Sequence, residues 1–368
     1  MTGRRVAGTL RVDRLPQSFL GERPGGTGIF VRVPASSANL GSGFDTLSLA
    51  LDLHLTVRMR LTPDQARPPR LSGEGAEELK GNTAGNLLLR AAEALLQRTG
   101  KGALLPHLEL VARNQIPVGK GLGSSAAAIV AGLYGANELI GRPLGTRQLR
   151  DMAVALEGHP DNVAAALLGG FTVSTQEVSL RLAAPEGLRF LALVPDEPLL
   201  TEKSRAVLPT TVPFATLTDA VQRATTLVAA LSLSASATSL RSSTAPLGAL
   251  TTRSRPTTAR ARDEAGEALQ LLGTLARGGF HEDVRARLVP GLSQALALLR
   301  GAGVPATLSG SGPTLLIWQS VWQALSAELF DQVCAALTSA GTTYHLLRLR
   351  PARRGAVIRV WHSRDVAS

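Results

Sequence analysis

The sequence predicts a two-domain protein of the α+β class. Its 368 residues exceed the size of one ordinary domain, and a hydrophobic content of 44% is enough to fill two cores. Segments with the alternating pattern of strands are interspersed with segments of helical spacing. We expect a loose N-terminal extension over 1–26, an N-terminal domain over 27–182, a C-terminal domain over 183–368, and a low-complexity insertion within the latter at about 231–262.

The N-terminal domain is predicted to begin with strands. The extension before it is rich in Arg, Pro and Gly, which favours an irregular chain. Apolar alternation or β-rich runs predict the strands, and spacing of 3.6 residues predicts the helices. The predicted strands cover 29–33, 47–59, 107–112, 171–174 and 190–194, and the predicted helices cover 86–97, 126–139 and 146–157, with a domain boundary within 176–188.

The C-terminal domain is interrupted by a biased segment. From about 231 to 262 the chain is built from Ser, Thr, Ala and Arg, has no acidic residue and shows no period. This composition predicts a mobile surface loop rather than a functional site. Helical and strand patterns resume from 264 to 360.

Composition narrows the class of protein. A single cysteine, Cys334, excludes an intramolecular disulfide and suits a reducing compartment, where we expect it to serve in packing. No apolar run reaches the roughly 18–20 residues that a membrane span needs. The sequence therefore predicts a cytoplasmic protein without a membrane partner.

The net charge of +11 raises the question of nucleic-acid binding. Only four of the 39 basic residues are lysines, and the arginines are scattered along the chain without interleaved aromatic residues. We therefore expect no nucleic-acid partner, although the positive balance favours anionic ligands such as a nucleotide.

The segment 116–127 is the most informative part of the chain. Its glycines at 119, 121 and 123 let the backbone approach a ligand, and the helix predicted after them would direct free N–H groups at an anion. The P-loop pattern fails because Lys120 is followed by glycine instead of Ser or Thr. The dinucleotide-binding fingerprint matches formally, but it does not come directly off a strand and lacks an acidic residue about 20 positions later. A turn that only packs a helix stays open as an alternative.

Residues 117–127 resemble the second signature, P-x-x-x-G-L-G-S-S-A-A, of the superfamily that contains galactokinase, homoserine kinase, mevalonate kinase and phosphomevalonate kinase. The resemblance implies a small-molecule kinase fold with an N-terminal ATP-binding domain of the ribosomal-S5-domain-2-like type and a ferredoxin-like α/β sandwich at the C-terminus. It also implies that Ser125 binds Mg²⁺ and that Lys120 adds charge near the phosphates. The implied phosphate-binding residues are Pro117, Gly119, Gly121, Leu122, Gly123, Ser124, Ser125 and Ala126.

Two further segments resemble the other signatures. Residues 34–45 resemble the first signature in its homoserine-kinase form, with Ser42 in place of the usual proline. By resemblance, Asn39 and Asp45 hold the polar groups of the substrate, and a carboxylate suits an ammonium group. Residues 308–314 resemble the third signature, a glycine-rich turn that closes over the nucleotide and the active site. Gly310 is the residue of this turn that the resemblance implies for the substrate.

Three weaker segments concern the choice of substrate. Residues 157–163 match the E-G-H-P-D-N-V of many homoserine kinases, in which the glutamate completes the Mg²⁺ shell. Residues 198–209 and 281–291 resemble stretches whose arginines clamp a carboxylate, although Asp283 and Val284 depart from the usual Pro and Tyr. The residues implied here are Glu157 for the metal, and His159, Asn162, Thr201, Arg205 and Arg285 for the substrate.

The resemblance implies ATP- and Mg²⁺-dependent phosphorylation of the side-chain hydroxyl of L-homoserine, a step of threonine biosynthesis. Ser125, Glu157 and Lys120 are then the catalytic residues, and Asp161 receives no firm role. Two alternatives stay open: a kinase of the same superfamily acting on mevalonate, shikimate or a sugar, and a non-catalytic paralogue that binds ATP. Homodimers are common in the superfamily, and the sequence leaves a homodimer open.

Overall fold

The computed structural model describes residues 27–79, 82, 85–185, 187–235, 271–320 and 325–362. The predicted extension 1–26 and residues 236–262 of the predicted insertion lie outside the described residues. The chain divides into two compact units. We call the described residues 27–38, 48–181 and 352–362 the N-terminal unit, and residues 39–47 with 182–351 the C-terminal unit.

The N-terminal unit is built on a mixed sheet, which has seven strands among the described residues. Five strands run in the order β11-β1-β2-β4-β3, and β5 pairs with β2 and β6. Neighbours on this path are antiparallel except β3 and β4. The strands are β1 (Thr27–Ala38), β2 (Leu47–Leu61), β3 (Arg70–Gly73), β4 (Leu108–Asn114), β5 (Phe171–Ser174), β6 (Ser179–Leu182) and β11 (Val357–His362).

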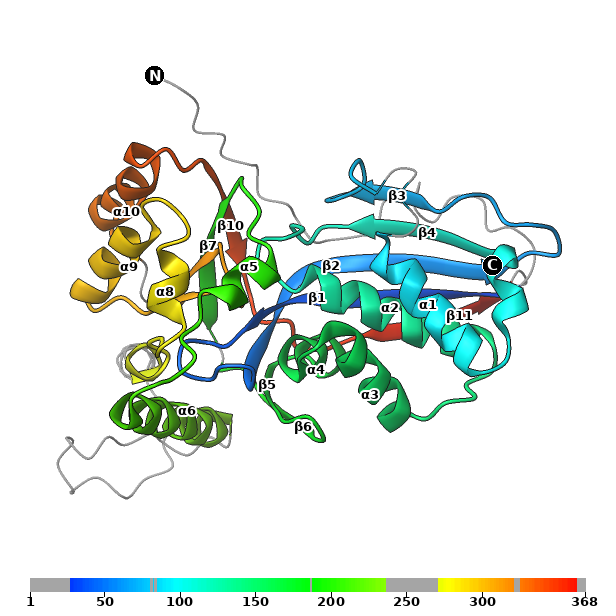
Figure 1. The fold of residues 1–368 in the computed structure, drawn as a ribbon, viewed down its shortest axis with the longest axis horizontal. Helices are drawn as coiled ribbons and strands as arrows, with labels where there is room; N and C mark the ends of the chain where they lie inside the picture. The colour runs from blue at the N-terminus through cyan, green and yellow to red at the C-terminus, as the bar shows by residue number, and fades with distance from the viewer. Residues whose placement is uncertain are drawn as a thin grey trace. The chain divides into compact units, whose positions relative to one another are not determined.

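Buried apolar side chains alternate along β1, and helices pack against this strand. Ile29, Val31 and Val33 are buried, and Val31 lies opposite the buried Val57 of β2. Helices α2 and α4 contact β1, and α1 packs on α2 (Figure 1). A Cβ on Gly132 would lie 2.3 Å from the carbonyl oxygen of Leu88, so α1 and α2 pack at a distance that only glycine permits. The helical elements are α1 (Leu87–Arg98), η1 (Gly102–His107), α2 (Ser124–Leu139), α3 (Thr146–Glu157) and α4 (Pro160–Leu168).

The C-terminal unit contains a second, antiparallel sheet in the order β10-β7-β9-β8. Its strands are β7 (Leu188–Pro195), β8 (Ala306–Leu308), β9 (Leu315–Ser320) and β10 (Tyr344–Leu349). Figure 1 shows α9 and α10 together beside this sheet, and their side chains meet it in a core that includes Leu193, Leu296, Ile317 and Val333. The helices are α5 (Thr201–Ala206), α6 (Phe214–Ala235), α8 (Glu282–Ala286), α9 (Leu292–Gly301) and α10 (Ala327–Ser339).

The observed elements confirm the α+β class and correct some boundaries. The run 126–139 is helical as expected, and its helix begins at Ser124, directly after the left-handed Gly123. Helix α6 continues to Ala235 with Leu231 buried, so the first residues of the expected insertion are helical. Cys334 is buried in α10, which confirms its role in packing. Within the described residues no helix is long and apolar enough to cross a membrane.

Candidate active site

The glycine-rich loop joins β4 to α2 in the N-terminal unit. Asn114, the last residue of β4, fixes its start: the Asn114 side chain accepts a hydrogen bond from the N–H of Ile116 and donates to the carbonyl of Ile116, both at 3.0 Å. The backbone then turns through glycines at 119, 121 and 123, whose φ angles of 69°, 72° and 71° lie in the left-handed region that favours glycine. This conformation brings the chain to the first turn of α2.

Gly123 is required by space as well as by its φ angle. A Cβ at this position would lie 1.9 Å from the Oγ of Ser36. Strand β1, which contains Ser36, also holds the loop, because the N–H of Ser36 donates to the carbonyl of Leu122 at 3.0 Å. Gly123 caps α2 without a side-chain hydrogen bond, so the 16-residue helix presents its first N–H groups at the loop. This arrangement suits an anion such as a phosphate group.

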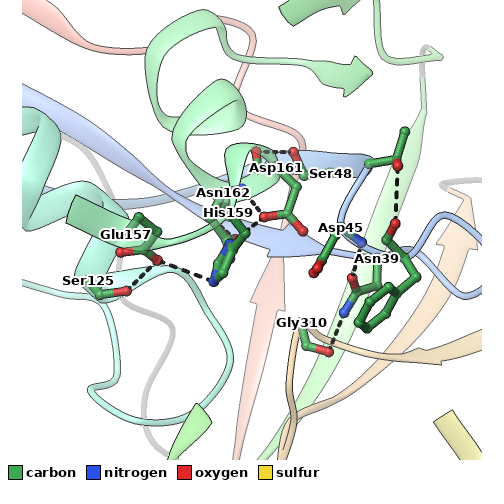
Figure 2. Close-up of polar contacts among 12 residues, drawn as sticks. Asn39, Asp45, Ser48, Ser125, Glu157, His159, Asp161, Asn162 and Gly310 are labelled. Atoms are coloured by element: carbon green, nitrogen blue, oxygen red, sulfur yellow. Dashed lines mark hydrogen bonds and ion pairs between the residues drawn. The ribbon is translucent and has the colours of Figure 1, made fainter. Parts of the chain in front are cut away.

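Ser125 and Glu157 meet at this helix start, as Figure 2 shows. The Oγ of Ser125 donates a hydrogen bond of 2.7 Å to Oε1 of Glu157. Glu157 is the last residue of α3, and its side chain is only 5% exposed. Burial raises the pKa of Glu157 to about 7, against the opposing effects of the Ser125 hydrogen bond and of His159. A hydroxyl and a carboxylate so placed form an oxygen pair that suits Mg²⁺.

The segment that follows Glu157 orients two polar side chains. His159 precedes α4, and its Nδ1 lies 2.7 Å from Oδ1 of Asp161, which also accepts from the N–H of Asn162 at 2.7 Å (Figure 2). The side-chain oxygen of Asn162 accepts from Ser36 at 2.7 Å. Asp161 is 1% exposed. Sequence reasoning left Asp161 without a role, and the structure gives it the task of orienting His159.

The turn 39–47 forms part of a polar cluster in the C-terminal unit. Asn39, Leu40 and Asp45 have positive φ angles of 69°, 44° and 51°. The side chain of Asn39 is the reason the turn closes: it accepts from the N–H of Asp45 at 3.0 Å and donates to the carbonyl of Gly310 at 2.7 Å (Figure 2). The amide expected to hold substrate therefore also organises the backbone around it.

Two arginines join this turn. Arg205, near the end of α5, donates to Oδ1 of Asp45 at 2.7 Å, and both side chains are about one-third exposed. Arg285 of α8 is buried and donates to the carbonyls of Ser204 at 3.2 Å and Gly310 at 3.4 Å. The cluster thus combines one carboxylate with two guanidinium groups. Thr201, the first residue of α5, lies exposed one turn before Arg205.

Two residues beside Arg285 had no predicted role. His281 is buried and donates from Nε2 to the carbonyl of Gly41 at 2.6 Å, since a carbonyl only accepts. Its Nδ1 then accepts from Nη1 of Arg285 at 3.4 Å, which requires a neutral ring. Glu282 is fully buried, pairs with Arg300 and accepts from the N–H of Leu308. Their position in the 281–291 stretch was the only sequence signal.

The chain is similar to known proteins over most of its length. The family model "GHMP kinases N terminal domain" matches residues 86–170, and "GHMP kinases C terminal" matches residues 259–320. A homoserine kinase of Moorella thermoacetica is 33% identical over 335 residues, which cover 89% of this chain and 99% of that protein. The chain belongs to the homoserine kinase family. Another homoserine kinase, of Deinococcus radiodurans, is 39% identical over 292 residues and covers 78% of this chain and 82% of that protein.

Solved structures agree on the fold of this homoserine kinase family member. A crystal structure of homoserine kinase from Cytophaga hutchinsonii superposes with a TM-score of 0.67 at 23% identity, over 90% of this chain and 97% of that one. A mevalonate diphosphate decarboxylase from Staphylococcus aureus shares the fold with a TM-score of 0.52 at 15% identity, over 91% and 98% of the two chains. These likenesses confirm the two-domain kinase fold predicted from the sequence.

Proposed function

We propose that this chain is a homoserine kinase, which transfers the γ-phosphoryl group of ATP to the side-chain hydroxyl of L-homoserine. The hydroxyl oxygen forms the new bond to the γ-phosphorus, and the hydroxyl proton is released to water. The bond from that phosphorus to the β,γ-bridging oxygen breaks, and ADP departs with this oxygen. The products are O-phospho-L-homoserine and ADP, a step that serves threonine biosynthesis.

The choice of substrate rests on the charged groups of the polar cluster around the turn 39–47. An amino acid brings one ammonium and one carboxylate, and the C-terminal unit offers Asp45 for the first, and Arg205 and Arg285 for the second. Within the C-terminal unit, the side chains of Asn39 and Thr201 and the carbonyl of Gly310 supply further polar contacts in this proposal. In the N-terminal unit, His159 and Asn162 are the side chains proposed for the substrate.

The loop before α2 is the proposed phosphate site. Backbone N–H groups from Gly119 to Ala126 suit the β- and γ-phosphates, because a helix start without a side-chain cap attracts negative charge. Lys120 adds positive charge to the same loop. Such groups act by positioning the phosphates and by stabilising charge that develops in the transition state.

Mg²⁺ is the proposed metal, held by the hydroxyl of Ser125 and the carboxylate of Glu157. These donors fit the preference of Mg²⁺ for a few protein oxygens alongside phosphate and water. When bound, the ion neutralises phosphate charge. The protein contributes to this proposed metal site by burying Glu157. Burial keeps the carboxylate away from bulk water, and the hydrogen bond with Ser125 holds the two side chains together.

Other alcohols fit this charge pattern less well. Mevalonate, shikimate and sugars lack an ammonium group, so Asp45 would have no positive partner in them. A non-catalytic paralogue is opposed by the Ser125–Glu157 pair, which a pure ATP-binding protein does not need. We also propose a cytoplasmic location and a homodimer, the latter to be measured by light scattering of the purified protein.

The test is ADP release by purified protein with ATP and Mg²⁺. L-homoserine is compared with mevalonate, shikimate, galactose and no acceptor, and Ser125→Ala is the matched variant. Homoserine-dependent release that Ser125→Ala abolishes supports the proposal. Release that is stimulated equally by another alcohol, or ATP binding without any stimulated release, would refute it.

A further inference from the structure

Phe44 lies at the centre of the polar cluster in the C-terminal unit, yet it has no polar group of its own. It sits in the turn 39–47, where the N–H groups of Thr46 and Leu47 bond back to the carbonyl of Gly43 at 3.0 and 2.8 Å. The ring has two aromatic neighbours: its centroid lies 5.4 Å from that of Phe280 and 5.1 Å from that of His281. Its position is therefore set by packing.

Both arginines of the cluster lie over this ring. The guanidinium carbon of Arg205 is 5.7 Å from the ring centroid, and that of Arg285 is 5.2 Å from it. These distances are within the range of cation–π attraction, in which the electron-rich face of the ring attracts a cation. One phenyl ring thus attracts two like charges and offsets part of their mutual repulsion.

Arg205 and Arg285 differ in how else they are held. Arg285 is buried and has hydrogen bonds to two backbone carbonyls, which fix its plane. Arg205 is more exposed and pairs with Asp45, the residue that directly follows Phe44. A substrate ammonium would compete for Asp45, and the ring would then be the contact that keeps Arg205 in place.

We propose that Phe44 is a positioning and specificity residue: its ring holds Arg205 and Arg285 in the arrangement that accepts the α-carboxylate of the substrate. This inference rests on the proposed function. It predicts that the ring acts on carboxylate binding and has little effect on phosphoryl transfer once the substrate is bound. Loss of the ring face should therefore raise KM for homoserine and spare kcat.

The experiment measures ADP release for Phe44→Leu, Phe44→Tyr and wild type with L-homoserine and with L-homoserinol, which has a hydroxymethyl group in place of the carboxylate. We expect Phe44→Leu to raise KM for homoserine about tenfold. Phe44→Leu should leave three constants within about twofold of wild type: KM for ATP, kcat with homoserine, and kcat/KM for homoserinol. Phe44→Tyr keeps the ring face, so all of its constants should stay within about twofold of wild type.

Phe190→Leu is the matched control, because Phe190 is a buried ring of the same unit that packs edge-on against Trp318 in the sheet. It should lower stability without changing the preference for homoserine over homoserinol. Should Phe44→Leu fail to fold, pentafluorophenylalanine at position 44 keeps the shape of the ring and reverses its charge distribution. It should raise KM for homoserine in the same way.

The outcomes separate the two proposals. If wild type does not use homoserine, the proposed function fails and this inference fails with it. If wild type uses homoserine but Phe44→Leu keeps its KM, only the role of Phe44 is overturned. It is also overturned if Phe44→Leu and Phe44→Tyr are equally impaired, or if homoserinol loses the same factor, because the ring would then act only by packing.

Discussion

Lowering the pH from 7.5 to 5.0 should destabilise the C-terminal unit through His281. Burial is the main cause that lowers the pKa of His281 from 6.5 to about 4, and Arg285 and Arg300 lower it further, while the bond to Gly41 opposes them. Phe44 and Phe280 are the aromatic groups that face the ring. The folded state therefore keeps this imidazole neutral down to about pH 4.

The sign of the effect follows from proton uptake. Above pH 6.5 the ring is neutral in both states, so it adds no pH dependence. Between pH 6.5 and 4 the unfolded chain binds a proton that the folded chain does not, which favours unfolding. With pKa values of 6.5 and about 4, the loss is about 2 kcal/mol at pH 5 and approaches about 3 kcal/mol below pH 4.

His281→Gln removes this titration while keeping an N–H that can reach the carbonyl of Gly41. Urea unfolding of both proteins at several pH values gives the difference in their free energies of unfolding, wild type minus variant. This difference should fall by about 2 kcal/mol from pH 7.5 to 5.0. Ile317→Val is the control: it removes one methylene from the hydrophobic core of the same unit and should shift stability equally at both pH values. A difference that is independent of pH would refute the reasoning.

Four other substitutions test the two proposed sites. Ser125→Ala and Glu157→Gln should each lower kcat/KM by at least about 100-fold with little loss of stability, since each removes an oxygen donor proposed for Mg²⁺. Gly123→Ala should cost at least about 1 kcal/mol of stability and weaken ATP binding, because the new Cβ has a left-handed φ and meets Ser36. Arg285→Lys should raise KM for homoserine at least about tenfold and leave KM for ATP unchanged, because lysine cannot form a planar fork.

Steady-state ADP release and calorimetric ATP titration measure these effects, with thermal unfolding run on every variant. Arg142→Lys is the neutral control, because Arg142 forms an exposed pair with Glu138 at the surface. Normal turnover in Glu157→Gln would contradict the metal assignment. An unchanged affinity for ATP in Gly123→Ala would contradict the phosphate assignment, and an equal rise of both KM values in Arg285→Lys would contradict the carboxylate assignment.

The conformation of the glycine-rich loop 116–127 could be predicted from the sequence because its requirements are local. Glycines at 119, 121 and 123 are needed where φ is positive, and a helix must start directly after them. The same holds for α3, whose predicted bounds agree with Thr146–Glu157 because Gly158 ends it with a φ of 91°. The residues that form such a pattern lie within about ten neighbouring positions, so the pattern is visible in the sequence.

Tertiary structure determined which residues meet in the polar cluster of the C-terminal unit. Asn39 and Gly310 are 271 positions apart, and His281 and Gly41 are 240 apart, yet each pair shares a hydrogen bond. The sequence identified most of these residues by resemblance, but it did not show that Phe44 lies beneath two arginines or that His281 must stay neutral. Local patterns indicated which residues are candidates for the chemistry. Packing of distant segments determined which of them touch, because that choice depends on the free energy of burying them together.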